Sequence, residues 1–217
     1  GDGPGDTNVS RVAAMTHPDG TVLGPSVPVV PIDAMYSSAS TTGFFPTGEI
    51  WESACVVSGM TFPSVVGVVV TTPYNVTLEH LWTVPPKAEQ PSTYVAGRLH
   101  AQCVNGSAAS ACLTTVSAST PLTVATAGAD GRVDPFEYYT LSPVSEAGFA
   151  FLGDVSKMVP VSPKLVKSIE TSETGMVVDL TGVPKTPYSV GFLTPVSQTV
   201  LFKTGVFDSD GTARVAV

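Results

Sequence analysis

The stretch Val65-Val66-Gly67-Val68-Val69-Val70 decides the fold of this chain. It contains no polar residue, five of its six residues are valines, and prolines close it at Pro63 and Pro73. β-Branched side chains fit a pleated strand, and an apolar run without alternation is typical of a strand covered on both faces. The sequence therefore predicts a buried strand here, with the rest of the chain arranged to cover it.

The segments around this run have the same extended character. Short apolar or alternating stretches, bounded by Gly, Pro, Asn and Asp, recur along the chain with almost no helical period. A proline-interrupted segment, residues 24–31, is expected to lie across a sheet edge because proline lacks the ladder donor. Strands are predicted at residues 8–15, 49–60, 65–70, 76–84, 94–104, 113–127 (two strands that break near Pro121), 132–141, 148–152, 176–180, 189–193 and 199–203, with a helix or a strand at 164–170.

These segments predict an all-β fold: an antiparallel β-sandwich or barrel of many short strands with long loops. Turns are predicted at His17-Pro18-Asp19-Gly20 and at Ser209-Asp210-Gly211. Residues 1–7 are expected to form a flexible lead, and residues 8–217 a single β-rich domain. Because the chain begins at Gly1 rather than Met, we expect it to be part of a longer polypeptide.

Charge and composition exclude several classes of protein. Lys and Arg number 10 against 18 Asp and Glu, a net charge of −8 that repels nucleic acid and anionic membrane surfaces. No apolar stretch approaches the roughly 20 residues that a membrane-spanning helix needs. The charged fraction of 13% is too low for a disordered chain. We therefore expect a folded domain with no nucleic-acid partner and no membrane partner.

The three cysteines leave at least one thiol without an intrachain partner. Cys103 and Cys112 flank a hairpin-like loop that could place them opposite one another as a disulfide. The alternative is that all three, including Cys55, are buried free thiols, because cysteine often serves as a small core residue.

The residues that could perform chemistry form no recognisable catalytic signature. A Gly-x-Ser-x-Gly elbow, a phosphate-binding loop and paired Cys-x-x-Cys ligands are all absent from the sequence. His80 and His100 could meet Glu79 or Glu52 as a metal site or catalytic base, against the simpler interpretation of two histidines on a solvated sheet face. The sequence therefore predicts a protein that is not an enzyme, with no cofactor and no metal.

Loops offer the better candidates for binding. Hydroxyl-rich loops with an occasional aromatic residue suit carbohydrate or protein ligands, and binding residues often lie on loops of a rigid scaffold. Seven loop residues are the candidate binding residues: Tyr36, Phe44, Tyr74, Asn75, Asn105, Asp130 and Arg132.

A resemblance adds a function to this fold. An acidic, Pro- and Thr-rich all-β unit of this size, led in by Val27-Pro28-Val29-Val30-Pro31, resembles the protruding or spike domain of a small non-enveloped RNA virus capsid, as in the caliciviruses, hepeviruses and astroviruses. The resemblance covers the character of the whole chain rather than a motif. It implies a domain on the virion surface of a capsid assembled in the host cytoplasm. It also implies a homodimer that binds a host receptor or attachment glycan and is recognised by antibodies.

Two other functions remain open. A secreted adhesin or carbohydrate-binding module would come from an oxidising compartment and should contain the bridge between Cys103 and Cys112, so three free thiols would argue against it. The odd cysteine count instead fits the spike domain, because capsids assemble in a reducing cytosol. A β-sandwich hydrolase would require His80 and His100 to share a pocket with a carboxylate.

Overall fold

The computed structural model describes residues 9–32, 49–68, 70, 73–84, 91–99, 103–126 and 136–217, except for the side chain of Arg11. In this part the chain is nearly all β, with antiparallel, open sheets, so the predicted β-sandwich is confirmed and no closed barrel is found in it. The elements are α1 (Val9–Met15), β1 (Val27–Pro31), β2 (Glu49–Val57), β3 (Met60–Val68), β4 (Tyr74–Val76), the 3-10 helix η1 (Leu78–His80), β5 (Thr93–Arg98), the 3-10 helix η2 (Ala109–Ala111), β6 (Leu113–Ser117), β7 (Leu122–Val124), β8 (Phe136–Pro143), β9 (Ala150–Gly153), β10 (Val166–Thr171), β11 (Met176–Thr181), β12 (Pro187–Thr194), β13 (Thr199–Val206) and β14 (Thr212–Ala216).

The predicted central strand lies inside the largest sheet, whose strand order is β1-β2-β3-β8-β5-β6. β3 pairs with β2 along its whole length and with β8 from Ser64 to Val68. No residue of β3 is exposed, and Val65 is completely buried. The segment with Pro28 and Pro31 is the edge strand β1, where a missing amide donor does least harm.

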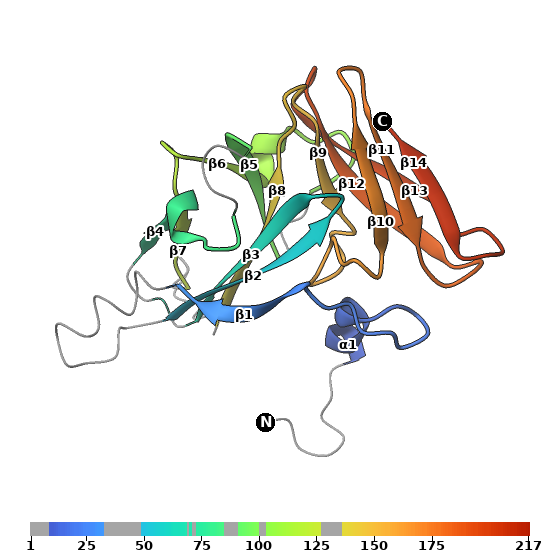
Figure 1. Cartoon of the computed structure of the whole chain (residues 1–217), viewed down its shortest axis with the longest axis horizontal. Coiled ribbons are helices and arrows are strands. Elements are labelled where there is room, and N and C mark those ends of the chain that lie inside the picture. Colours follow the sequence, from blue (N-terminus) through green and yellow to red (C-terminus); the bar gives the residue numbers. More distant parts are fainter. Residues whose placement is uncertain are drawn as a thin grey trace, which may run out of the picture.

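One face of this six-stranded sheet, here named the β4/β7 face, is covered by the two-stranded sheet of β4 and β7 and by η1 (Figure 1). Tyr94 and Leu141 of the large sheet pack there against Leu78 and Val124. Among the described residues, the buried members of this core are Ile32, Ile50, Val65, Val70, Val76, Leu78, Leu81, Val84, Tyr94, Ala96, Val116, Leu122, Val124 and Leu141.

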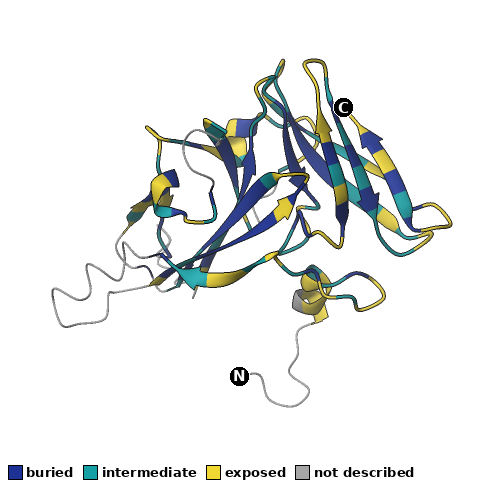
Figure 2. Cartoon of the chain, in the orientation of Figure 1, coloured by how far each residue is buried: buried dark blue, intermediate teal, exposed yellow. Residues whose placement is uncertain are grey.

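The opposite face of the large sheet, here named the sandwich face, turns toward two three-stranded sheets, β13-β12-β9 and β10-β11-β14. The β13-β12-β9 sheet is the middle layer. Leu152 and Leu193 on one of its sides pack against Val95 of β5, and Phe151 and Phe192 on the other side join the core of the β10-β11-β14 sheet. Figure 2 shows β9 and much of β12 buried, whereas β13 is mostly half-buried or exposed.

The outer side of the β10-β11-β14 sheet is polar. Arg214 donates from Nη1 to both carboxylate oxygens of Asp179 at 3.0 Å and from Nη2 to Glu170 at 3.4 Å. Ser168 donates to Asp179 at 2.8 Å. This side faces water, as the alternation of apolar and polar residues in the last strands predicts.

The prediction of a strand over residues 8–15 is wrong within the described residues, because Val9–Met15 is the helix α1. Val9, Val12 and Met15 are spaced by three rather than two positions, a helical period. The carbonyls of the last helical turn are also satisfied: Lys157 Nζ donates to Ala13 O, and Met158 N to Ala14 O. Neither α1 nor any other helix in the described part is long and apolar enough to cross a membrane.

The predicted strand over residues 76–84 is also wrong beyond its first residue. β4 ends at Val76 and η1 follows, so that Leu78, Leu81 and Val84 all reach the core. This spacing of three again matches the period of a 3-10 turn. Proline-rich ends and a β-branched start made the segment resemble a strand.

Several other boundaries differ from the prediction. Residues 49–60 are not one strand: a turn at Ser58 and Gly59, both with positive φ, ends β2 and begins β3. β5 ends at Arg98, before residues 100–102, which lie outside the described part. Of the helix and the strand that the sequence left open for residues 164–170, the structure contains the strand, β10. The two turns at residues 17–20 and 209–211 and the break near Pro121 are confirmed.

Candidate recognition surface

The predicted binding residues do not form one site. Tyr36, Phe44, Asp130 and Arg132 lie outside the described residues. Of the other three, Tyr74 and Asn75 belong to β4 on the β4/β7 face, whereas Asn105 lies beside β13, on the other side of the large sheet.

Tyr74 and Asn75 have partners within the fold. The ring of Tyr74 lies beside that of His80, with 6.0 Å between centroids, and burial raises the pKa of its hydroxyl. Asn75 is exposed, and its Oδ1 accepts a hydrogen bond of 2.9 Å from Thr123 in β7. Both side chains therefore stabilise the attachment of β4.

A disulfide bond joins Cys103 and Cys112, and residues 103–112 are named the disulfide loop below. Of the two alternatives that the sequence left open, the structure contains the bridge. The remaining cysteine, Cys55, is free and buried, and burial raises the pKa of its thiol to about 11. Cys103 and Cys112 therefore lie at a loop, whereas Cys55 lies in the core.

The disulfide loop runs along the outer edge of β13. Gly106 N donates to Val200 O at 2.8 Å, and Val200 N donates to Ser107 O at 2.9 Å. Asn105 Oδ1 accepts a hydrogen bond of 2.8 Å from Phe202 N. The Asn105 side chain thus continues the pairing that the loop backbone begins, a structural role that sequence reasoning missed.

The turn between β12 and β13, residues 195–198, meets the disulfide loop. Ala109 N donates to Gln198 O at 2.7 Å. The turn before β9 also packs closely, because a Cβ on Gly148 would lie 2.8 Å from the Cβ of Pro195, and the φ of Gly148 is +85°. The disulfide loop and residues 195–198 are together named the loop cluster.

The loop cluster exposes apolar side chains on an uncharged surface. Val196 is 99% exposed and Val104 61% exposed. The cluster contains no charged residue, although the chain has a net charge of −8. The hydroxyls of Thr194, Ser197 and Thr199 hydrogen-bond one another at the base of the turn. Neutral, polar-rimmed apolar groups on braced loops are typical of a recognition surface.

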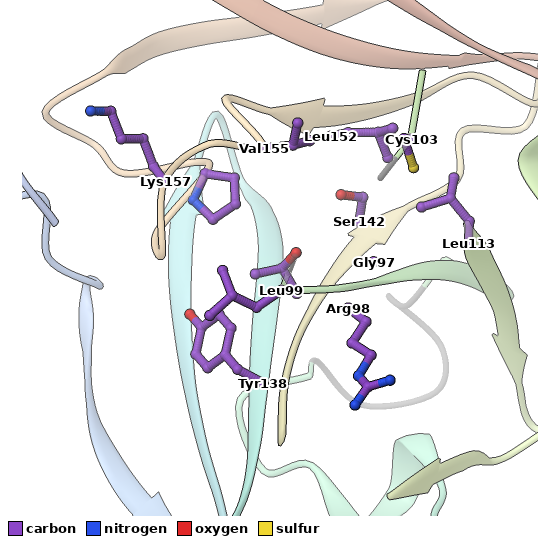
Figure 3. A pocket seen from close by; sticks show the side chains of 12 residues that line it. Gly97, Arg98, Leu99, Cys103, Leu113, Tyr138, Ser142, Leu152, Val155 and Lys157 are labelled. Carbon is purple, nitrogen blue, oxygen red and sulfur yellow. The ribbon is translucent and has the colours of Figure 1, made fainter. Parts of the chain in front are cut away.

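A groove lies between the sandwich face and the segment after β9 (Figure 3). It contains about 480 Å³ of space between atoms, part of it open to solvent. Its lining is mainly apolar, with a few hydroxyl and basic groups: Gly97, Arg98, Leu99, Cys103, Leu113, Tyr138, Thr140, Ser142, Leu152, Val155, Lys157 and Pro160.

The long polar side chains of this groove are already engaged. Tyr138 donates to Ser64 Oγ at 3.0 Å, and burial raises its pKa to about 12. Lys157 Nζ donates to Ala13 O and Thr16 O. Arg98 points away from the groove in Figure 3 and pairs with Glu137. These groups hold elements together and do not form a nucleophile and base pair.

Two of the groups proposed for a metal or catalytic site, His80 and Glu52, have structural partners. His80 Nδ1 accepts a hydrogen bond of 3.2 Å from Thr77 N, and Glu52 Oε1 accepts one of 2.9 Å from Trp82 N. No group of three His, Cys, Asp or Glu side chains that could hold a metal occurs among the residues described. His100 lies outside them, so the structure does not test the alternative in which His80 and His100 meet.

Val104 and Val196 are the residues of this surface that the sequence interpretation did not single out. The signal was available for Val196, which lies in a Pro-Val-Ser-Gln turn between two predicted strands and so has no core to face. No protein-family model matches the chain, and its sequence matches no curated protein.

Proposed function

We propose that this chain is a surface-projecting capsid spike domain that binds a host receptor or attachment glycan and presents antibody epitopes. The observation that carries the proposal is the loop cluster, an uncharged and exposed pair of loops on an all-β scaffold. The resemblance in size, acidity and composition to capsid projections supplies the viral context.

The bracing of the loop cluster supports a role in recognition. Binding a partner orders loops and side chains, which costs free energy, and loops that are already ordered avoid part of this cost. The disulfide bond and the hydrogen bonds to β13 order the loop cluster before any partner arrives. Fully exposed Val196 adds apolar surface that only a partner can bury.

The disulfide bond also bears on the compartment. Disulfides persist in secreted proteins and on virion or cell surfaces, and are rare in a reducing cytosol. The Cys103–Cys112 bridge is therefore compatible with display on a virion after release. It equally favours the second candidate function, a secreted adhesin or carbohydrate-binding module.

A binding experiment with surface variants tests the proposal. The fluorescently labelled chain is applied to a panel of animal cell lines and to a glycan array. We expect that a variant with both V104D and V196D binds at least tenfold more weakly than the natural chain, because charge replaces the apolar contacts. Val22→Asp is the matched control, since Val22 is 59% exposed and lies outside the loop cluster.

Equal loss of binding in the control and the double variant would contradict a role for the loop cluster. Absence of binding to every cell line and every glycan would contradict the attachment function itself. Immunoelectron microscopy with antibodies against the chain separates the two candidates, because a spike domain is labelled on particles and an adhesin on cells or in the medium.

A further inference from the structure

The described residues cover only half of the outer edge of β13. Neighbouring residues of a strand turn their N–H and C=O groups to opposite sides. Val200 and Phe202 turn theirs away from β12, toward the disulfide loop. By the same alternation Thr204 and Val206 turn their groups to this edge, where no described residue bonds them.

The covering segment is a loop that imitates a strand. It supplies backbone groups of Gly106 and Ser107 and the side-chain oxygen of Asn105, in the positions where a neighbouring strand would supply its own backbone. An isolated β-bridge between Ala108 and Thr199 completes the contact. The edge of β13 can thus pair with another strand, and the disulfide loop occupies the part of this edge at Val200 and Phe202.

We propose that the edge of β13 pairs with the same edge of a second copy of this chain, and that the Cys103–Cys112 bridge controls this pairing. With the bridge closed, the disulfide loop covers Val200 and Phe202. With the bridge open, the loop is tied to β13 only by its hydrogen bonds and can leave the edge.

The sequence of β13 suits antiparallel pairing with itself. Thr199–Val206 contains no proline and is rich in β-branched and aromatic residues. A two-fold axis at Phe202 places the two Phe202 rings opposite each other and Val200 opposite Thr204, and each such pair exchanges two hydrogen bonds. Lys203 then lies opposite Leu201 rather than opposite a second lysine, so like charges do not face each other directly.

The edge strand β1 of the six-stranded sheet is less suited to pairing than β13. β1 contains Pro28 and Pro31, which lack donors, and its register is interrupted between Val27 and Val30. Natural sheets block their edges by such prolines and irregularities. β13 contains no proline and its register with β12 is uninterrupted, so the disulfide loop is what protects its edge.

The chemical step is the reduction of one disulfide by a thiol reductant. Two electrons and two protons pass to the two sulfurs and yield the thiols of Cys103 and Cys112, while the reductant forms its own disulfide. Cys55 takes no part, because it is buried and free and its raised pKa leaves little thiolate to exchange. In a reducing cytoplasm the edge is open for pairing, and outside the cell oxidation closes it.

Light scattering after size-exclusion chromatography tests the inference on the full chain. We expect the association constant of the dimer to increase at least tenfold when the natural chain is reduced with dithiothreitol. A variant with both C103S and C112S should show the same increase without reductant. Amide hydrogen exchange at Val200 and Phe202 should accelerate in the reduced monomer while the exchange of Val178 in β11 stays slow.

Thr204→Pro supplies the matched variant. It removes an outward-facing donor and leaves the pairing with β12 intact, so in the reduced chain it should abolish the added dimerisation, whereas Thr204→Ala should preserve it. Unchanged self-association on reduction, or dimerisation that persists with Thr204→Pro, would overturn the inference. If the double cysteine variant does not fold, the reduced natural chain, monitored by circular dichroism, decides the question.

Discussion

Glu52 shows how a single buried residue can fix a long segment. Its side chain is fully buried on the β4/β7 face, and Oε1 accepts hydrogen bonds from the amides of Trp82 at 2.9 Å and Thr83 at 3.3 Å. A buried carboxylate is costly unless such donors compensate it. These bonds hold the segment after η1 on the sheet, where an uninterrupted strand had been expected.

Replacing Glu52 with alanine should therefore destabilise the fold. We expect Glu52→Ala to lower the free energy of unfolding by about 2–4 kcal/mol, because two partly buried amides lose their acceptor. Urea denaturation followed by tryptophan fluorescence measures this change. Glu173→Ala is the control: Glu173 is exposed in the turn after β10, and its substitution should change the value by less than about 0.5 kcal/mol.

Among the elements, β3 depends on a glycine for its contact with the β4–β7 pair. A Cβ at Gly67 would lie 2.4 Å from Cγ1 of Val124, a side chain that is completely buried. The glycine inside the valine run is thus the point where the small sheet approaches the large one. The sequence interpretation did not single out this glycine, although a glycine inside a strand often marks a close approach of another segment.

Gly67→Ala should overpack this contact. We expect a decrease of about 1–3 kcal/mol in the free energy of unfolding, measured by thermal or urea denaturation. Gly24→Ala offers a matched comparison, because a Cβ there meets no atom within 4 Å and the φ of Gly24 is not positive. Equal effects at the two positions would show that close packing is not the reason for glycine at 67.

Sequence patterns predicted elements well where one face of a strand meets water. β11 alternates buried and half-buried residues without exception, and it was found within one residue of its real bounds. The pattern failed where the chain leaves a sheet. α1 and the segment from Leu78 to Val84 repeat apolar residues every three positions, but each is too short for this period to stand out from alternation.

At the scale of the whole molecule, the stacking of layers could not be read from the sequence. The apolar pattern shows that β9 and β12 are buried, but not that one side packs on β5 and the other on the β10-β11-β14 sheet. Such contacts join residues distant along the chain and leave no local signal. For the same reason only Asn105 among the seven predicted binding residues lies in the loop cluster. Its side chain accepts a hydrogen bond from Phe202 N and so stabilises the contact with β13.

The layers also bury tyrosines, which predicts an alkaline limit of stability. Burial raises the pKa of Tyr94 and of Tyr138 from 10.0 to about 12. In the unfolded chain these hydroxyls ionise near pH 10, whereas in the folded chain they keep their protons to about pH 12. Their contribution to stability is thus complete below pH 10 and is lost as the pH rises from about 10 to about 12.

Absorbance at 295 nm checks this prediction directly. At pH 11 the folded chain should contain less tyrosinate than the same chain in concentrated urea, and its free energy of unfolding should be lower than at pH 9. Tyr138→Phe should reduce the steepness of that decrease. Identical tyrosinate titrations of the folded and unfolded chain would contradict the burial of these hydroxyls.

The place of the middle layer has a consequence for biosynthesis. β9 is translated before β10 and β11, whereas β12, with which it pairs, and β13, the strand beyond β12, follow them, and β13 ends at Val206. Until then Val95 and Leu152 have no complete layer to cover them. A nascent chain of this order holds its six-stranded sheet with one apolar surface open until residues 187–206 have been made, and such transiently exposed apolar surface is what chaperones protect.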